Sequence, residues 1–288
     1  MTAAPHRTGT TRSGDVDLFY RLFGAGTGTP VVIAHGANYY DSYDWIDVAA
    51  KLARNRAVVA YDGRGYGLSS WSAAKDYTTE ANTCDVKAVA DEFDWRRVIV
   101  LGHSRGGAFA TQFAAHFPDR VAGLVLIDAL PEAAEIPPAP IRAIGKTAEI
   151  YPTMDAALAA TSRDPAVAPG SPAAERLAMF LRPVEGGYVL AQRDPDFRNQ
   201  MPLVPAYWPI RIPPQLDMRR AMKRVEAPIL IVRALHSHHD HSPAVIAGLH
   251  AEFPTMEMVT VDSGHDVATG APDALVDAVE RFAARLAG

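Results

Sequence analysis

The chain has 288 residues, which is enough for one large domain or two small ones. Apolar residues make up 48% of it and charged residues 21%, as in an ordinary soluble globular protein, and the net charge of −5 argues against nucleic-acid binding. No stretch approaches the roughly 18 uninterrupted apolar residues of a membrane span, and residues 1–14 lack the apolar core of a signal peptide. We therefore expect a cytoplasmic protein without nucleic acid or membrane as a partner.

The first half of the chain alternates between strand-like and helix-like segments. Runs rich in β-branched and aromatic residues predict strands at 16–23, 31–34, 57–61, 98–101 and 121–127. Helices are expected between them at 44–53, 81–93 and 108–117. The helix at 81–93 carries the one cysteine, Cys84, which we interpret as a spectator thiol.

The C-terminal part of the chain resumes this alternation. Strands are expected at 229–232 and 256–261, with helices at 243–252 and 274–287. Alternating strands and helices predict an α/β fold, with a mostly parallel sheet and helices on both faces. We assign residues 1–130 and 223–288 to this core.

The segment between these halves, residues 131–222, has a different composition. It holds 15 of the 22 prolines, few strand signals, and two short helical stretches at 154–160 and 173–181. Its Tyr, Trp, Phe and Met content is too apolar for a disordered linker. We therefore predict an inserted helical cap over the edge of the sheet.

The most informative motif is Gly102-His-Ser104-Arg-Gly106, which directly follows a predicted strand and precedes a predicted helix. A serine on so tight a turn exposes its hydroxyl at the carboxyl end of the sheet, and the glycines let strand, turn and helix pack closely. This context makes Ser104 the predicted nucleophile.

A serine hydroxyl needs a general base, because it is almost never ionised near neutral pH. His265 follows the last predicted strand, at the edge of the sheet where Ser104 is expected, and is the predicted base. His103 and His35 flank motif positions, and we predict that they line the substrate site, with Gly36, or pack against the protein, and do not act as bases.

The oxyanion of an acyl-transfer intermediate needs hydrogen-bond donors that are fixed in advance. The backbone N–H of Arg105 comes with the nucleophile turn, and the loop after the strand at 31–34 offers the N–H of Ala37. These two groups are the predicted oxyanion hole.

Taken together, Gly102-His-Ser-Arg-Gly-Gly, His35-Gly36, Asp62-Gly-Arg-Gly-Tyr-Gly-Leu-Ser and Gly264-His265 resemble the α/β-hydrolase superfamily. The resemblance spans nearly the whole chain outside the cap. It implies an eight-stranded sheet, a lid inserted after the sixth strand, and a Ser–His–acid triad that needs no cofactor.

The resemblance leaves the triad acid open. Most relatives carry it after the strand corresponding to 229–232, where this chain has Ser237 and His238, and Asp240 lies two or three residues late. A minority carry it after the preceding strand, where Asp128 stands. Asp128 is our favoured candidate and Asp240 the alternative.

The run His236-Ser-His-His-Asp240-His241 matches the metal-binding pattern of the metallo-β-lactamase superfamily, and its side chains would suit zinc. The further ligands of such a site are missing downstream, since only His250 and His265 remain. We therefore predict no metal site and treat a metal-dependent hydrolase as a minor alternative.

These features predict a cofactor-independent serine esterase or lactonase that acts on a small apolar or aromatic molecule, as a monomer or homodimer. Tyr207 and Trp208 of the cap are predicted to contact substrate, and Arg105 or Arg211 could pair with a substrate carboxylate. The alternatives are a cofactor-free lyase or dioxygenase on the same fold and a non-catalytic ligand-binding receptor.

Overall fold

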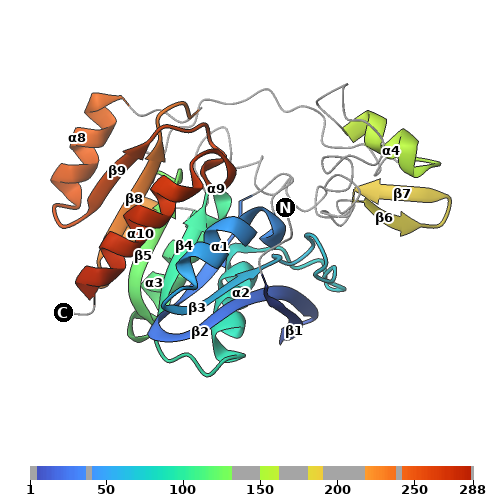
Figure 1. Cartoon of the computed structure of the whole chain (residues 1–288), viewed down its shortest axis with the longest axis horizontal. Helices are drawn as coiled ribbons and strands as arrows, with labels where there is room; N and C mark the ends of the chain where they lie inside the picture. Colours follow the sequence, from blue (N-terminus) through green and yellow to red (C-terminus); the bar gives the residue numbers. More distant parts are fainter. Residues whose placement is uncertain are drawn as a thin grey trace.

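The computed structural model describes residues 5–36, 41–131, 150–161, 181–190, 218–237 and 242–286. Its main feature is a seven-stranded sheet with strand order β1-β2-β4-β5-β8-β9, in which β3 also pairs with β2 (Figure 1). The strands are β1 (Arg7–Ser13), β2 (Val16–Ala34), β3 (Arg56–Tyr61), β4 (Val98–His103), β5 (Val121–Ile127), β8 (Ile229–Ala234) and β9 (Glu257–Val261). From the second half of β2 onward the pairs are parallel, as predicted.

The sheet has seven strands, and not the eight implied by the resemblance, because 16–23 and 31–34 form one long bent strand, β2. Its two halves pair with different edges of β3. Val31–Ala34 pair in ascending register with Val58–Tyr61, whereas Tyr20–Phe23 pair with the same residues in descending register. The bent strand thus occupies two positions, so the sheet is eight positions wide.

The central strands are buried on both faces, which explains their nearly continuous apolar sequence. In β4, Val98 and Val100 point into one hydrophobic cluster, while Ile99 and Leu101 point into the other. This alternation follows from the two-residue period of a strand. Each face of the sheet therefore has its own hydrophobic cluster, and the sheet lies as the middle layer between two sets of helices.

Helices cover both faces of the sheet (Figure 1). The first cluster includes residues of α2 (Thr79–Asp91), α3 (Arg105–His116), α7 (Met218–Met222) and α8 (Pro243–Glu252). The second includes residues of α1 (Ile46–Leu52), α9 (Val267–Gly270) and α10 (Pro272–Leu286). None of the helices in the described ranges combines the length and apolar character that crossing a membrane requires.

Local sequence signals explain where these helices begin. Thr78 caps α2 by accepting a hydrogen bond from the N–H of Ala81, and Ser242 caps α8, which starts at Pro243. In α10, Leu275, Val279 and Phe282 are buried against the sheet, as their helical spacing predicts.

The described parts of the predicted cap contain α4 (Met154–Thr161) and an antiparallel hairpin of β6 (Leu181–Val184) and β7 (Gly187–Leu190). Tyr151, just before α4, pairs with Tyr188 of β7, so these elements pack together (Figure 1). The hairpin was not predicted, and Leu181 belongs to a strand and not to the expected helix 173–181, whose other residues lie outside the described ranges. The cap boundaries remain predictions.

Candidate active site

Ser104 lies between the end of β4 and the start of α3, on the predicted turn. Its backbone has φ 51° and ψ −121°, a conformation that residues with a side chain rarely adopt. Such strain typically amounts to about 1–3 kcal/mol and persists only where the surroundings enforce it. The N–H of Ser104 donates to the carbonyl of Ile127 at 3.0 Å, which ties the turn to β5.

Two glycines allow the turn to form. A Cβ on Gly102 would lie 2.5 Å from the carbonyl oxygen of Gly106, and one on Gly106 would lie 2.3 Å from that of Ala34. These neighbours are backbone atoms, which cannot move aside without displacing a strand or the helix. The close approach of β4, α3 and the end of β2 therefore requires glycine at both positions.

His265 follows β9 and lies between Ser104 and Asp128. Its Nε2 is 3.0 Å from Ser104 Oγ, and its Nδ1 is 2.6 Å from Asp128 Oδ2. Since a carboxylate only accepts, Nδ1 carries the proton of the neutral ring, and the unprotonated Nε2 can accept the Ser104 hydroxyl proton. The structure thus brings together three predicted residues in the order that acyl transfer requires.

Asp128 is the favoured acid, and the end of β5 places it beneath His265. Its side chain is 0% exposed. Burial raises the pKa of this carboxyl, but hydrogen bonds from His265, Ser237 and the N–H of Ala234 outweigh burial, so the pKa lies well below its ordinary value. Asp128 is therefore ionised at neutral pH and suited to stabilise an imidazolium.

Several predicted residues lie outside the described ranges: the alternative acid Asp240, the oxyanion candidate Ala37, and the cap residues Tyr207, Trp208 and Arg211. No role was predicted for Ser237, although this serine stands where most relatives have the triad acid. Its hydroxyl donates to Asp128 Oδ2 at 2.6 Å. A hydroxyl at the usual position of the acid could have indicated that Ser237 contacts the triad.

His103 faces the protein interior, which agrees with the packing alternative and not with substrate contact. Its side chain is buried, its ring lies 4.8 Å from that of His265 and 5.9 Å from that of Trp45, and its Nε2 donates to the carbonyl of His265 at 2.8 Å. Burial and the neighbouring His265 lower the pKa of His103 to about 3. A neutral His103 therefore supports the backbone of the predicted base.

His35 is also buried, and its side chain contacts backbone groups. Its Nε2 accepts the N–H of Gly63 at 2.8 Å, so the ring proton is on Nδ1 and is donated to the carbonyl of Gly36 at 2.7 Å. Burial lowers the pKa of His35 to about 4. His35 thus joins the end of β2 to the turn that follows β3.

That turn is organised by Asp62, which is buried. Its carboxylate accepts the N–H and hydroxyl of Ser42 at 2.8 and 2.5 Å and the N–H of Leu68 at 2.8 Å. Burial raises the pKa of Asp62 to about 6, and the Asp41 carboxylate acts in the same direction. Through His35 and Ser42, the turn anchors the chain on both sides of the segment that contains Ala37.

Arg105 is the first residue of α3, and its backbone N–H belongs to the helix N-terminus, where the positive end of the helix dipole favours negative charge. Its guanidinium stacks on the rings of Tyr66 and Phe109, with 4.8 and 5.1 Å to their centroids. The backbone position agrees with the predicted oxyanion contact. The side chain contacts rings of its own protein.

Of the histidine-rich run 236–241, only His236 and Ser237 are described. The Nε2 of His236 is 2.9 Å from Asp262 Oδ1, and both side chains are largely exposed. Within the described ranges, no group of three or more His, Cys, Asp or Glu side chains is arranged to hold a metal ion.

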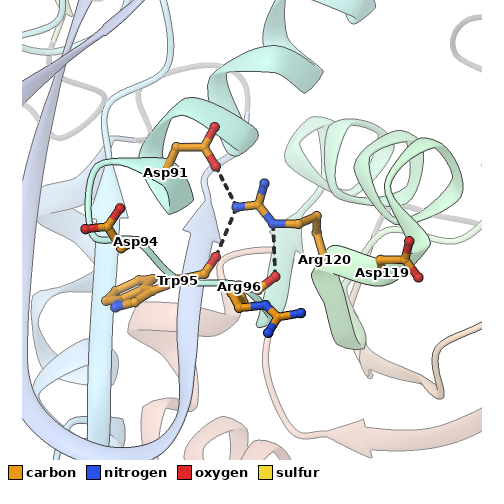
Figure 2. A pocket seen from close by; sticks show the side chains of 6 residues that line it. All are labelled: Asp91, Asp94, Trp95, Arg96, Asp119 and Arg120. Carbon is orange, nitrogen blue, oxygen red and sulfur yellow. Dashed lines mark hydrogen bonds and ion pairs between the residues drawn. The ribbon is translucent and has the colours of Figure 1, made fainter.

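A cavity of about 400 Å³ lies at the opposite edge of the sheet, next to the loops that precede β4 and β5 (Figure 2). Arg120 is one of the residues that line it and donates hydrogen bonds to Asp91 and to the carbonyls of Trp95 and Arg96. These contacts connect two loops at the amino ends of the strands, whereas Ser104 and Asp128 follow the carboxyl ends. The cavity is therefore separate from the candidate site.

Comparison with known proteins agrees with this geometry. A family model described as the alpha/beta hydrolase fold matches residues 29–168, which include the nucleophile turn and Asp128. A hypothetical protein of Pseudomonas aeruginosa PAO1 has a similar structure over 98% of this chain and 99% of its own, with a TM-score of 0.70 and 28% identity. The chain belongs to the α/β-hydrolase superfamily.

Curated relatives within this superfamily carry different activities. A 2-hydroxy-6-oxo-2,4-heptadienoate hydrolase of Pseudomonas putida is 34% identical over 111 residues, which make up 38% of this chain and 40% of that protein. A non-heme chloroperoxidase of Streptomyces lividans is 36% identical over 124 residues, or 42% of this chain and 44% of that protein. The chain thus matches less than half the length of either relative.

Proposed function

We propose that this α/β-hydrolase is a serine hydrolase that cleaves an ester or lactone through an acyl-enzyme at Ser104. The single observation that carries the proposal is the continuous line from Ser104 Oγ through His265 to Asp128, with distances of 3.0 and 2.6 Å. A strained serine at the start of a helix adds the second element of acyl-transfer chemistry, a site for negative charge.

In the proposed mechanism, His265 Nε2 takes the Ser104 proton as Oγ attacks the substrate carbonyl carbon. The resulting oxyanion accepts hydrogen bonds from the N–H groups of Arg105 and Ala37. His265 then gives its proton to the leaving oxygen, and the ester or lactone bond breaks. A water molecule loses a proton to His265 and attacks the acyl-enzyme, after which the proton returns to Ser104.

The substrate class follows from the composition of the predicted cap. Aromatic and methionine side chains in residues 131–222, including Tyr207 and Trp208, favour an apolar or aromatic acyl compound. The Pseudomonas putida relative, named as a hydrolase of an unsaturated oxo acid, supports hydrolysis of small molecules. Because a chloroperoxidase is among the relatives, the first property to test is whether ester hydrolysis depends on Ser104, over several substrates and not a single one.

The test is hydrolysis of a series of p-nitrophenyl esters, from acetate to benzoate, by the wild type, Ser104→Ala and Ser242→Ala. Ser242 caps α8 outside the site and controls for a lost serine hydroxyl. We expect kcat to fall by at least about a thousandfold in Ser104→Ala and to stay within about twofold in Ser242→Ala. Equal turnover in Ser104→Ala would refute the proposal, and oxygen uptake or elimination that survives it would favour a dioxygenase or lyase.

A further inference from the structure

The two oxygens of Asp128 are held differently. Oδ1 accepts the N–H of Ala234 at 3.1 Å, whereas Oδ2 accepts from both His265 Nδ1 and Ser237 Oγ, each at 2.6 Å. The predicted base and a serine hydroxyl therefore share one carboxylate oxygen. Two of the three donors come from the end of β8 and the residues after it, and the third comes from the loop after β9, so the carboxylate joins these two segments.

Ser237 is placed by the backbone that follows β8. The N–H of Leu235 donates to the carbonyl of Val261 at 2.9 Å, and the N–H of His236 donates to that of Ser263 at 3.0 Å. These bonds continue the β8–β9 pairing beyond the strand ends, toward the loop that carries His265. The position of Ser237 is thus set by the same two strand ends that deliver the base.

We propose that Ser237 is a positioning residue that fixes Asp128 Oδ2 against His265 and, by withdrawing charge from that oxygen, limits how strongly the imidazolium is stabilised. The proposal rests on the proposed function, because it assigns Ser237 a part in the same acyl-transfer reaction. A hydrogen bond to one oxygen reduces the charge available to a second donor on that oxygen.

Among the described residues, His103 is a second ionisable side chain in contact with His265, and it does not compete with this effect. The ring of His103 packs 4.8 Å from that of His265, but its pKa is lowered to about 3, so it stays neutral across the working range of an esterase. Asp128 is the only carboxylate within hydrogen-bond distance of His265 among the contacts of the described residues. Changes at Ser237 should therefore reach His265 through Asp128.

The experiment compares the pH dependence of p-nitrophenyl ester hydrolysis in the wild type, Ser237→Ala, Ser237→Thr and the capping control Ser242→Ala. In Ser237→Ala we expect kcat to fall about fivefold with KM unchanged, because one hydrogen bond that orients Asp128 is lost. The acid limb of kcat/KM should move to higher pH by about half a unit, because the unshared carboxylate favours the imidazolium more strongly. Ser237→Thr, which keeps the hydroxyl, should restore both values.

Two results would overturn the proposal. One is a folded Ser237→Ala with wild-type kcat and an unmoved acid limb. The other is a lower kcat with an unmoved acid limb that Ser237→Thr does not restore, which indicates a merely structural role. Ser104→Ala is measured alongside, so that failure of the proposed function appears as surviving activity in that variant, whereas failure at Ser237 alone leaves Ser104→Ala inactive.

Discussion

At the scale of single residues, two members of the candidate triad have unusual backbone conformations. Ser104 has φ 51° and Asp128 has φ 40°, and both directly follow buried parallel strands. Each conformation is enforced from outside the residue: the N–H of Ser104 donates to Ile127 and that of Asp128 donates to Val232 at 2.7 Å. Hydrogen bonds to neighbouring strands thus hold both residues in strained conformations in which their side chains contact His265.

The role of Asp128 gives the most direct residue-scale prediction. Asp128→Asn keeps the shape of the side chain but removes the charge that stabilises imidazolium and the acceptor that selects the His265 tautomer. We expect kcat to fall by about a thousandfold or more at pH 7, measured with the same ester. Asp262→Asn, in an exposed pair with His236, is the matched control and should change kcat by less than about twofold. Comparable losses in both variants would contradict the assignment of the acid.

The sequence predicted Ser104 and His265 because their signals are local: a glycine-flanked serine between strand and helix, and a histidine after the last strand. The sequence did not decide whether Asp128 or Asp240 is the triad acid. The distance of either carboxylate from His265 depends on which strands are neighbours in the sheet, and these strands are far apart in the sequence. His35 and His103 were predicted to line the site or to pack, because a motif position does not reveal whether a side chain points inward, and both are buried. The inward direction is visible only from their contacts with Gly63 and His265.

At the scale of elements, the central strands were predictable because burial on both faces leaves an apolar run without alternation, as in Val121–Ile127. The bend of β2 was not predicted, since the strands at 16–23 and 31–34 were expected as separate elements and residues 24–30 between them carry three glycines. The hairpin β6–β7 was also missed. Its signal was the two-residue turn Glu185-Gly186, where Gly186 has φ 87°. The strands have only four residues each, and β6 contains Pro183, so their sequences gave little strand pattern.

The packing of the nucleophile turn leads to a prediction at this scale. Gly106→Ala should lower the free energy of unfolding by about 2–3 kcal/mol, because its Cβ would lie 2.3 and 2.5 Å from the backbone oxygens of Ala34 and His35. Gly248→Ala, in the middle of α8 with no atom within 4 Å of the added Cβ, should instead raise it by about 0.5–1 kcal/mol. Urea unfolding of both variants checks this pair, and a Gly106→Ala protein as stable as the wild type would contradict the geometry.

At the scale of the whole molecule, several ionisable side chains are buried at the ends of the strands. His35 and His103 are neutral in the folded protein, with pKa values lowered by burial from 6.5 to about 4 and about 3. Below pH 6.5 both histidines become protonated in the unfolded chain, whereas in the folded protein they stay neutral until about pH 4 and pH 3. Asp62 acts in the opposite sense, because its pKa is raised to about 6 and the folded protein keeps a proton that the unfolded chain has lost.

These groups predict how stability depends on pH. Between pH 6.5 and 5 the two histidines outweigh Asp62 by about one proton, so the free energy of unfolding should be about 2 kcal/mol lower at pH 5 than at pH 6.5. Asp62→Asn removes the opposing group and should roughly double the slope over this interval, as measured by urea unfolding at several pH values. Stability that is constant or rises toward pH 5 would show that the histidines accept protons while the protein remains folded.

The central claim is that Ser104 is the nucleophile of acyl transfer, and covalent labelling tests it most directly. The full-length wild type is treated with a fluorophosphonate at neutral pH, and the modified residue is mapped by mass spectrometry, with Ser104→Ala and heat-denatured wild type as controls. We predict one label on Ser104 of the folded wild type and none in either control, because His265 must activate the hydroxyl. A folded protein that takes no label, or takes it on another residue, would contradict the assignment of Ser104 as the nucleophile.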